Sequence, residues 1–271
     1  MNRPPFGLGS AAAGEAAALL WECWGAARRI DALPDRCRPA GVDDGWAIQR
    51  ALDGHAGPAV GWKIAATSPA GQAHIGADGP LCGRVYKRMV VPPGSELDAA
   101  VLAMGMGSAE AEFAFRLGTD LDAAGAPVDR QRAIAAVASL HPAIEVPGSR
   151  FTDFSAVGVP SLVADAMCGA HVVVGEAARG WDPERLPVHP VEMLRNGEPV
   201  AAGSGANVLG DPCLALAWLA NELGRRGEML RTGDLVITGA CTSPNAITAG
   251  DALRADFCAL GAVEIAFPTA G

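Results

Sequence analysis

Three glutamates in apolar surroundings are the residues of this chain best suited to carry chemistry. Glu110 and Glu112 alternate with alanines and phenylalanines in the segment AEAEFAF, and residues two apart in a β-strand share a face. Glu145 lies in a second apolar run, AIEV. Three carboxylates presented from strands suit a hard divalent cation such as Mg²⁺, which prefers oxygen ligands. A Glu-x-Glu pair is more often a solvated face paired with arginine, so the spacing alone leaves both interpretations open.

Lys63 is the next candidate, because it lies between Trp62 and Ile64 in an expected strand and Lys87 is the only other lysine in the chain. Beside a metal site, a lysine can act as an electrostatic or proton-transferring group; the alternative is an ordinary surface lysine. Motifs of other enzyme classes are absent from the sequence. The histidines show no zinc-binding spacing, Ser204 lacks a Gly-x-Ser-x-Gly elbow, and residues 105–107 lack the third glycine of a dinucleotide-binding loop.

Composition excludes several classes of protein. A chain of 271 residues with 50% hydrophobic and 19% charged residues can form a sizeable core. Acidic residues outnumber basic ones by 30 to 21 without a basic cluster, so we expect no nucleic-acid partner. No apolar run approaches about 18 residues, and charged residues interrupt the alanine-rich N-terminal stretch, so we expect neither membrane insertion nor secretion. Seven scattered cysteines without a Cys-x-x-Cys pair indicate a cytoplasmic protein without structural zinc.

The hydrophobic pattern divides the chain into two parts. Helical spacing predicts helices over 11–31 and from about 43 to 52, which form a small N-terminal helical unit at residues 1–60. Residues 61–271 are expected to form a strand-rich catalytic domain with helices at about 128–138 and 211–227. The expected strands are short apolar runs separated by Gly, Pro and Asp, at 61–66, 81–91, 109–117, 143–146, 171–175, 235–238 and 252–260. The fold class is therefore α+β.

Several short motifs occur in the order and spacing of one family. They are GWKI at 61–64, AEAEFAF at 109–115, PAIE at 142–145 followed by Ser149 and Arg150, and GDLVITG at 233–239, with further matches at 47–49, 76–80, 209–212 and 250–251. Together the motifs cover nearly the whole chain from about residue 11. On these motifs the chain resembles the 2-keto-4-pentenoate hydratase and 4-oxalocrotonate decarboxylase family, which belongs to the fumarylacetoacetate hydrolase superfamily.

The resemblance implies a mixed β-roll, like the C-terminal domain of fumarylacetoacetate hydrolase, in which Glu110, Glu112 and Glu145 hold Mg²⁺ or Mn²⁺. In this family an enolisable 2-oxo acid chelates the metal ion, which acts as a Lewis acid. Members assemble into homo-oligomers, so we expect one here.

The same resemblance assigns the remaining site residues. Lys63 is expected to orient the substrate carboxylate or to assist proton transfer, and Asp78 is the nearest matching acid. Asp165, Arg150 and Thr238 are expected to contact the substrate. One departure from the family lies at 166–168, where Ala, Met and Cys replace the usual asparagine and small polar residues. This replacement predicts a bulkier or less polar substrate.

Two enzyme activities and one non-catalytic role compete. The leading hypothesis is a metal-dependent hydratase of a 2-hydroxy-2,4-dienoate produced by meta-cleavage of aromatic compounds. The alternative is decarboxylation of a 2-oxo-3-enedioate, for which Arg84, Arg88 and Arg150 are candidates to bind the second carboxylate. A C–C hydrolase is disfavoured because no matching His-x-x-Glu segment is present. Because residues 166–168 differ from the family pattern, a non-catalytic member of the family is a further alternative.

Overall fold

Two β-sheets form the body of the molecule. The computed structural model describes residues 7–97, 102 and 106–269. Within them, an eight-stranded mixed sheet has the order β2-β1-β9-β4-β5-β6-β3, with β10 paired to β4. Its strands are β1 (Ala59–Ala65), β2 (Leu81–Tyr86), β3 (Val90–Val91), β4 (Ser108–Leu117), β5 (Val137–Val146), β6 (His171–Val174), β9 (Leu235–Ala240) and β10 (Asn245–Ala246).

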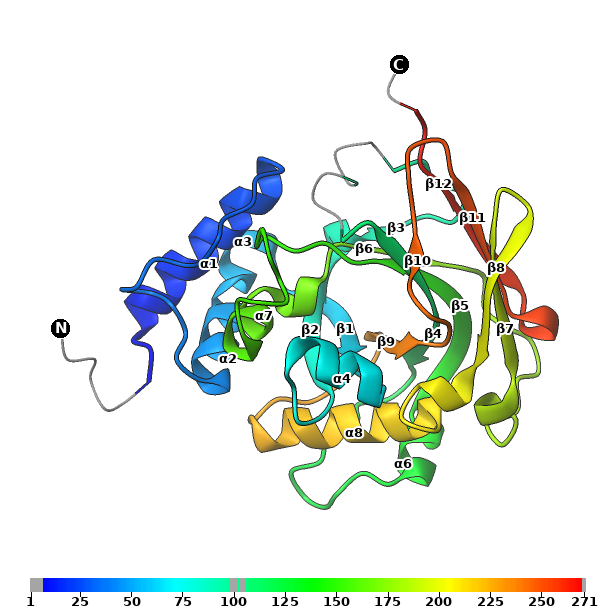
Figure 1. Cartoon of the computed structure of the whole chain (residues 1–271). Coiled ribbons are helices and arrows are strands. Elements are labelled where there is room, and N and C mark those ends of the chain that lie inside the picture. The colour runs from blue at the N-terminus through cyan, green and yellow to red at the C-terminus, as the bar shows by residue number, and fades with distance from the viewer. Residues whose placement is uncertain (1–6, 98–101, 103–105, 270–271) are drawn as a thin grey trace.

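A four-stranded sheet of order β12-β11-β7-β8 packs beside β5 and β6, on the right in Figure 1. Its strands are β7 (Pro190–Arg195), β8 (Glu198–Ser204), β11 (Ala252–Asp256) and β12 (Ala262–Ala266). Aromatic rings join the two sheets, since Phe113 of β4 meets Phe257 edge to face at a centroid distance of 5.0 Å. The larger sheet curls, so the expected strand-rich α+β fold is confirmed (Figure 1).

Strand β4 is the central element of the site. It pairs antiparallel with both β9 and β5, and this register sets Glu110 opposite Glu145 and Glu112 opposite Ala143. Its other face lies in the core, as the alternating sequence predicts, and carries the fully buried residues Ala111, Phe113 and Phe115. The two predicted glutamate segments are therefore neighbouring strands.

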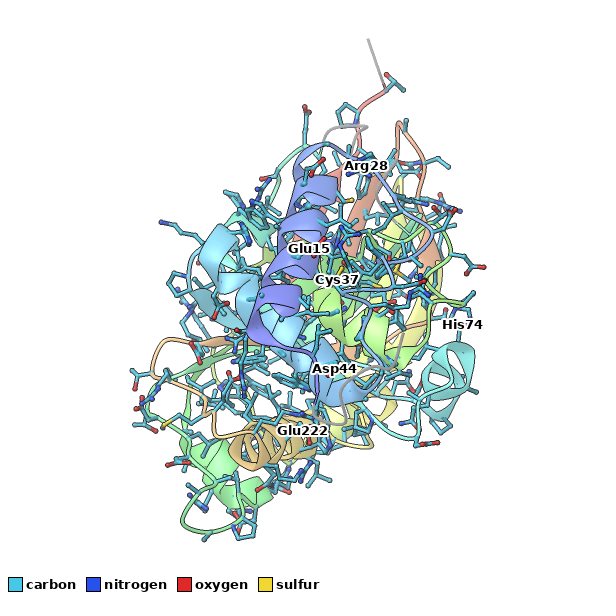
Figure 2. The ribbon with its side chains drawn as sticks, turned by 90° about the vertical axis from the view of Figure 1, so that its left-hand side faces the viewer. Glu15, Arg28, Cys37, Asp44, His74 and Glu222 are labelled. Carbon is cyan, nitrogen blue, oxygen red and sulfur yellow. The ribbon has the colours of Figure 1, made fainter. Side chains whose placement is uncertain are left out.

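Helices cover two sides of the body. On the left in Figure 1, α1 (Ser10–Gly25), α2 (Val42–Ala51) and α3 (Asp53–Ala56) form the expected helical unit, and α7 (Val159–Ala164) packs against α2. Figure 2 views these helices from outside, with Glu15 of α1 and Asp44 of α2 labelled. Below the sheet, α8 (Pro212–Arg225) packs with α6 (Arg130–Ala135). None of the helices in the described ranges is long and apolar enough to cross a membrane.

Gln49 links the helical unit to the sheet. Its side-chain amide is fully buried, donates to the Val163 carbonyl at 2.7 Å and accepts from the Arg84 backbone N–H at 3.0 Å. Val163 belongs to α7 and Arg84 to β2, so these hydrogen bonds connect residues before and after position 60. The boundary between 1–60 and 61–271 stays a prediction.

Several predicted elements have different bounds in the structure. The helix expected over 128–138 is only Arg130–Ala135, and the strand expected at 143–146 already begins at Val137. Helix α1 stops at Gly25 instead of residue 31, and Ala27 just beyond it adopts a left-handed φ of 47°. The strand expected over 81–91 breaks after Tyr86 into a short 3₁₀ turn at Lys87–Met89. The run expected over 252–260 is strand only to Asp256, after which a tight turn returns the chain as β12. In these segments the apolar runs correctly predict which residues are buried, but they do not show where the chain turns.

Helix α4 (Pro69–Ile75) was not predicted, although its start carries a standard signal. The Ser68 hydroxyl accepts from the Gly71 N–H at 3.1 Å, and Pro69 occupies the first turn. Short 3₁₀ turns complete the described chain at Ala166–Cys168, Leu186–Val188, Gly205–Asn207 and Cys258–Leu260.

Candidate metal centre and active site

The three predicted glutamates come together in space. Glu110 and Glu112 on β4 and Glu145 on β5 each offer a carboxylate oxygen, and these oxygens all lie within 4.8 Å of one another. Glu112 and Glu145 are each 1% exposed, so water screens them little. Glu110 is half-buried and lines the cavity described below. The solvated-face interpretation of the Glu-x-Glu pair is therefore wrong, because Glu112 is buried and Glu110 belongs to the same carboxylate cluster.

Burial makes this cluster electrostatically unfavourable when it is empty. Desolvation and the neighbouring Glu145 raise the pKa of Glu110 to about 7, against the lowering effect of Lys63. Desolvation, Glu145 and Glu110 together hold the pKa of Glu112 well above its usual range. Glu112 accepts a hydrogen bond from the Gly239 N–H on Oε2, while no described residue bonds its buried Oε1. An all-oxygen set with an unused buried oxygen fits a hard divalent cation.

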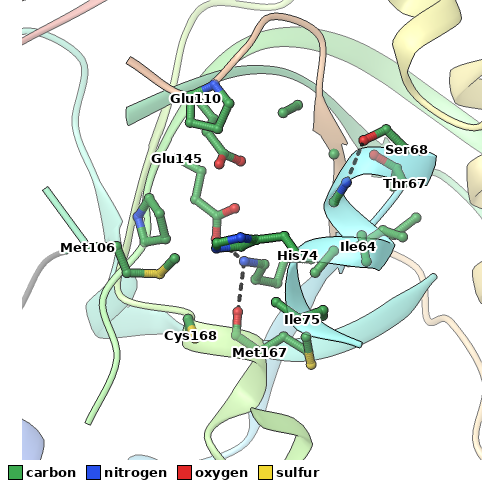
Figure 3. A pocket seen from close by; sticks show the side chains of 18 of the residues that line it. Ile64, Thr67, Ser68, His74, Ile75, Met106, Glu110, Glu145, Met167 and Cys168 are labelled. Atoms are coloured by element: carbon green, nitrogen blue, oxygen red, sulfur yellow. Dashed lines mark hydrogen bonds and ion pairs between the residues drawn. The ribbon is translucent and has the colours of Figure 1, made fainter. Parts of the chain in front are cut away.

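Lys63 on β1 lies against this cluster and is 4% exposed. Its Nζ is 2.7 Å from Glu145 Oε1 and donates to the Met167 carbonyl at 2.9 Å (Figure 3). Burial alone would lower the pKa of Lys63, but the surrounding glutamates outweigh it and raise the pKa. Among the described residues the ammonium donates a hydrogen bond to Met167 and forms an ion pair with Glu145, which leaves an N–H for a ligand.

The carbonyl that Lys63 binds belongs to a strained turn. Ala166, Met167 and Cys168 all have left-handed φ angles, of 47°, 52° and 59°. Such a conformation costs on the order of 1–3 kcal/mol per residue and persists only where the surroundings impose it. Here it turns the Met167 carbonyl toward the lysine.

Arg150 and Asp165 impose that turn. Their side chains form a buried ion pair, and the Arg150 guanidinium also donates to the carbonyls of Gly148 at 3.0 Å and Gly169 at 2.7 Å. The Ser149 hydroxyl donates to the Asp165 carboxylate at 3.1 Å. Both residues were expected to contact substrate, but neither lines the cavity described below. The structure places them behind the turn, where they hold it.

Two other predicted residues also lie outside the cavity. The Thr238 hydroxyl is fully buried and donates to the Phe113 carbonyl at 3.0 Å, so it joins β9 to β4. Asp78 is exposed in the loop after α4 and does not line the cavity. Thr242 was missed: it lines the cavity, is 3% exposed, and its hydroxyl has no partner among the described residues. No sequence signal distinguishes this threonine from its neighbours in the loop after β9.

One cavity of about 630 Å³ contains the charged groups. Glu110, Glu145 and Lys63 occupy part of its wall, and Figure 3 shows both carboxylates reaching into the same space. The other walls come from α4, the 3₁₀ turn at 166–168 and the loops around them, and include Thr67, Ser68, His74, Ile75, Met106, Phe154, Leu162, Met167, Cys168 and Thr242. The site thus combines a metal-binding carboxylate cluster, a lysine and a ligand-sized cavity.

A curled mixed sheet that holds a cluster of three carboxylates, two of which line one cavity together with a lysine, defines a metal-binding, enzyme-like domain. The family model described as "Fumarylacetoacetate (FAA) hydrolase C-terminal" matches residues 83–267. The chain belongs to this fumarylacetoacetate hydrolase family, and its sequence resemblance is thereby confirmed.

Relatives and solved structures agree over most of the chain. The chain is 32% identical to "2-keto-4-pentenoate hydratase" of Paraburkholderia xenovorans, over 93% of this chain and 94% of that protein. It is 32% identical to "4-oxalocrotonate decarboxylase" of Pseudomonas putida, over 82% of each. A solved "4-oxalocrotonate decarboxylase from Pseudomonas putida G7 - complexed with magnesium and adipate" superposes with a TM-score of 0.85 at 28% identity, covering 98% of this chain and all of that one. A divalent cation in that structure agrees with the donor set found here.

The carboxylate cluster predicts a pH-dependent effect of metal on stability. A carboxyl whose pKa is raised by folding stabilises the fold below its unfolded pKa of about 4.3 and loses this contribution as pH rises through its folded value, about 7 for Glu110. In EDTA, the melting temperature should therefore fall between about pH 5 and 8, and Mg²⁺ should offset more of that fall at the higher pH. Glu110→Gln should flatten the EDTA curve. Parallel curves with and without Mg²⁺ would contradict a carboxylate metal site.

Proposed function

We propose that the protein is a divalent-metal-dependent hydro-lyase that adds water to a 2-hydroxy-2,4-dienoate and forms a 4-hydroxy-2-oxo acid. The observation that carries this proposal is the buried cluster of Glu110, Glu112 and Glu145 beside Lys63 at one cavity, in a chain 32% identical to a 2-keto-4-pentenoate hydratase. The hydratase names among the relatives also support a role in meta-cleavage of aromatic compounds.

The residues of the site divide the work by their chemistry. The three glutamates would hold Mg²⁺ or Mn²⁺, which supplies Lewis acidity toward the oxygens of a 2-oxo or 2-hydroxy acid. Lys63 offers its remaining N–H to the substrate carboxylate and holds a proton beside the glutamate cluster. The unpartnered hydroxyl of Thr242 is available to bond a second polar group of the substrate or the attacking water. Arg150 and Asp165 act through the turn that positions Lys63.

Decarboxylation of a 2-oxo-3-enedioate remains the second candidate, because a relative at 32% identity and the solved structure at TM-score 0.85 carry that name. The same carboxylate cluster and lysine would serve it, since both reactions need an electron sink at the 2-oxo acid. The two differ in what the rest of the cavity must bind.

The reaction can be followed by ultraviolet absorbance of freshly generated 2-hydroxypenta-2,4-dienoate. With Mg²⁺ we expect the conjugated signal to disappear without release of carbon dioxide, and EDTA should abolish the change. Carbon dioxide release from a 2-oxo-3-enedioate would instead establish the decarboxylase. A protein that binds neither Mg²⁺ nor oxalate by calorimetry would be a non-catalytic member of the family.

We propose a cytoplasmic location and a homo-oligomer as well. All seven cysteines are free thiols, six of them buried, which supports a reducing compartment. Half-buried tryptophans on α1, Trp21 and Trp24, offer apolar surface for a second copy. Light scattering should give a mass above the 27.6 kDa of one chain.

A further inference from the structure

The cavity has a charged end, and the rest of its wall is mainly apolar with a few neutral polar side chains such as Thr67, Ser68 and Asn207. Glu110, Glu145 and Lys63 mark the charged end. Large apolar side chains on separate segments form much of the remaining wall: Figure 3 labels Met106, Ile75 and Met167, and Phe154 and Leu162 complete this set. We call these five residues the apolar wall.

The cavity is larger than a five-carbon acid requires. Pockets for drug-sized ligands measure about 300–1,000 Å³, and this one measures about 630 Å³. A short dienoate bound at the charged end would leave the apolar wall facing water, which is unfavourable. A ligand with an apolar group at its far end would cover that wall.

Among the described residues, the far end offers no strongly basic partner for a second carboxylate. Of the described lining residues, only Lys63 and His74 carry basic side chains, and Lys63 is bound to Glu145. His74 is exposed and stacks on Phe154 with ring centroids 5.6 Å apart. A dicarboxylate would therefore find no lysine or arginine free to pair with its second charge among the described lining residues, and only His74 as a basic side chain.

The three arginines considered for that second carboxylate are engaged elsewhere. Arg84 pairs with Glu228 at 2.5 Å, Arg88 stacks on two tryptophans of α1, and Arg150 is bound to Asp165. None of the three lines the described cavity. The expectation that they serve a dicarboxylate is not supported by their positions.

We propose that the substrate is a monocarboxylate whose end remote from the carboxylate carries a bulky apolar group, such as a phenyl ring. This proposal rests on the proposed function for its charged end and deepens it by naming the tail. The carboxylate and 2-oxygen lie at the glutamates and Lys63, and the tail packs on the apolar wall. Met167 and Cys168, which replace polar residues at 166–168, thus contribute apolar surface to the tail site.

Binding of unreactive 2-oxo acids tests the tail separately from the chemistry. Calorimetry with Mg²⁺ would compare 2-oxobutanoate, 2-oxo-4-phenylbutanoate and 2-oxoglutarate. We expect the phenyl acid to bind at least about tenfold more tightly than 2-oxobutanoate, because burial of each added methylene-sized group contributes several-fold. We expect 2-oxoglutarate to bind no more tightly than 2-oxobutanoate. Equal affinity for the phenyl and short acids, or tightest binding of 2-oxoglutarate, would overturn the proposal.

Phe154→Ala should remove most of the preference for the phenyl acid, reducing the affinity ratio by about tenfold. Leu214→Ala is the matched control, because Leu214 is 46% exposed on α8, outside the cavity, and the ratio should not change. An unchanged ratio in Phe154→Ala would place the tail elsewhere and contradict the apolar wall as its site.

Turnover completes the test. Hydration of 2-hydroxy-5-phenylpenta-2,4-dienoate should proceed with a kcat/KM at least about tenfold above that of the five-carbon dienoate. A phenyl preference in binding with no hydration of either compound would support the tail site and refute the hydratase. Hydration with a preference for the five-carbon compound would support the hydratase and refute the tail.

Discussion

Glu112→Gln is expected to reduce Mg²⁺ affinity by more than about 100-fold, because substitution of residues that only support a ligand already costs about 10–100-fold. Turnover at fixed Mg²⁺ should fall to background. Glutamine retains the shape of the side chain and an oxygen for the Gly239 N–H, so the change is confined to charge. Calorimetric titration with Mg²⁺ and the absorbance assay measure the two losses.

The stability of this variant separates lost chemistry from lost folding. In the absence of metal, Glu112→Gln should melt no lower than the native protein, because it removes one of three mutually repelling buried carboxylates. Glu192→Gln on β7 is the matched control, since it makes the same change on an exposed strand position and should leave affinity and turnover unaffected. Full turnover in Glu112→Gln would show that the cluster is not the metal site.

The chemistry at the charged end was predictable from sequence because it depends on strand alternation. Glu110 and Glu112 must share a face in any strand, and the buried residues Ala111, Phe113 and Phe115 on the other face place that strand in the core. Lys63 stood out through its apolar neighbours. The sequence did not show which strands pair with each other. The register between β4 and β5 is what brings Glu145 opposite Glu110.

The expected substrate contacts that do not line the described cavity share a common physical feature. Thr238, Arg150 and Asp165 lie in segments that resemble the family, but their side chains point into the protein and satisfy hydrogen bonds there. A motif identifies a position without giving the direction of its side chain. The apolar wall escaped prediction for the opposite reason, because α4 and the loop around Phe154 have no hydrophobic period of their own and form a surface only after folding.

Asp165→Asn is expected to destabilise the protein by about 3–5 kcal/mol, because it leaves the Arg150 guanidinium buried without its counter-charge. Arg150→Met should destabilise the protein by a similar amount, because it leaves the Asp165 carboxylate buried without its counter-charge. Chemical denaturation of the metal-free proteins measures both. A surface pair gives the matched control: Arg254 and Glu264 form an exposed ion pair, and Glu264→Gln should change stability by less than about 1 kcal/mol.

The double variant Arg150→Met/Asp165→Leu tests whether the ion pair only balances two buried charges or also holds the turn at 166–168 in its conformation. It should recover much of the stability lost by either single variant, since no unpaired buried charge remains. Its turnover should nevertheless stay low, because nothing then binds the carbonyls of Gly148 and Gly169, and the left-handed turn no longer presents the Met167 carbonyl to Lys63. Recovery of both stability and turnover would show that Lys63 is positioned without the turn.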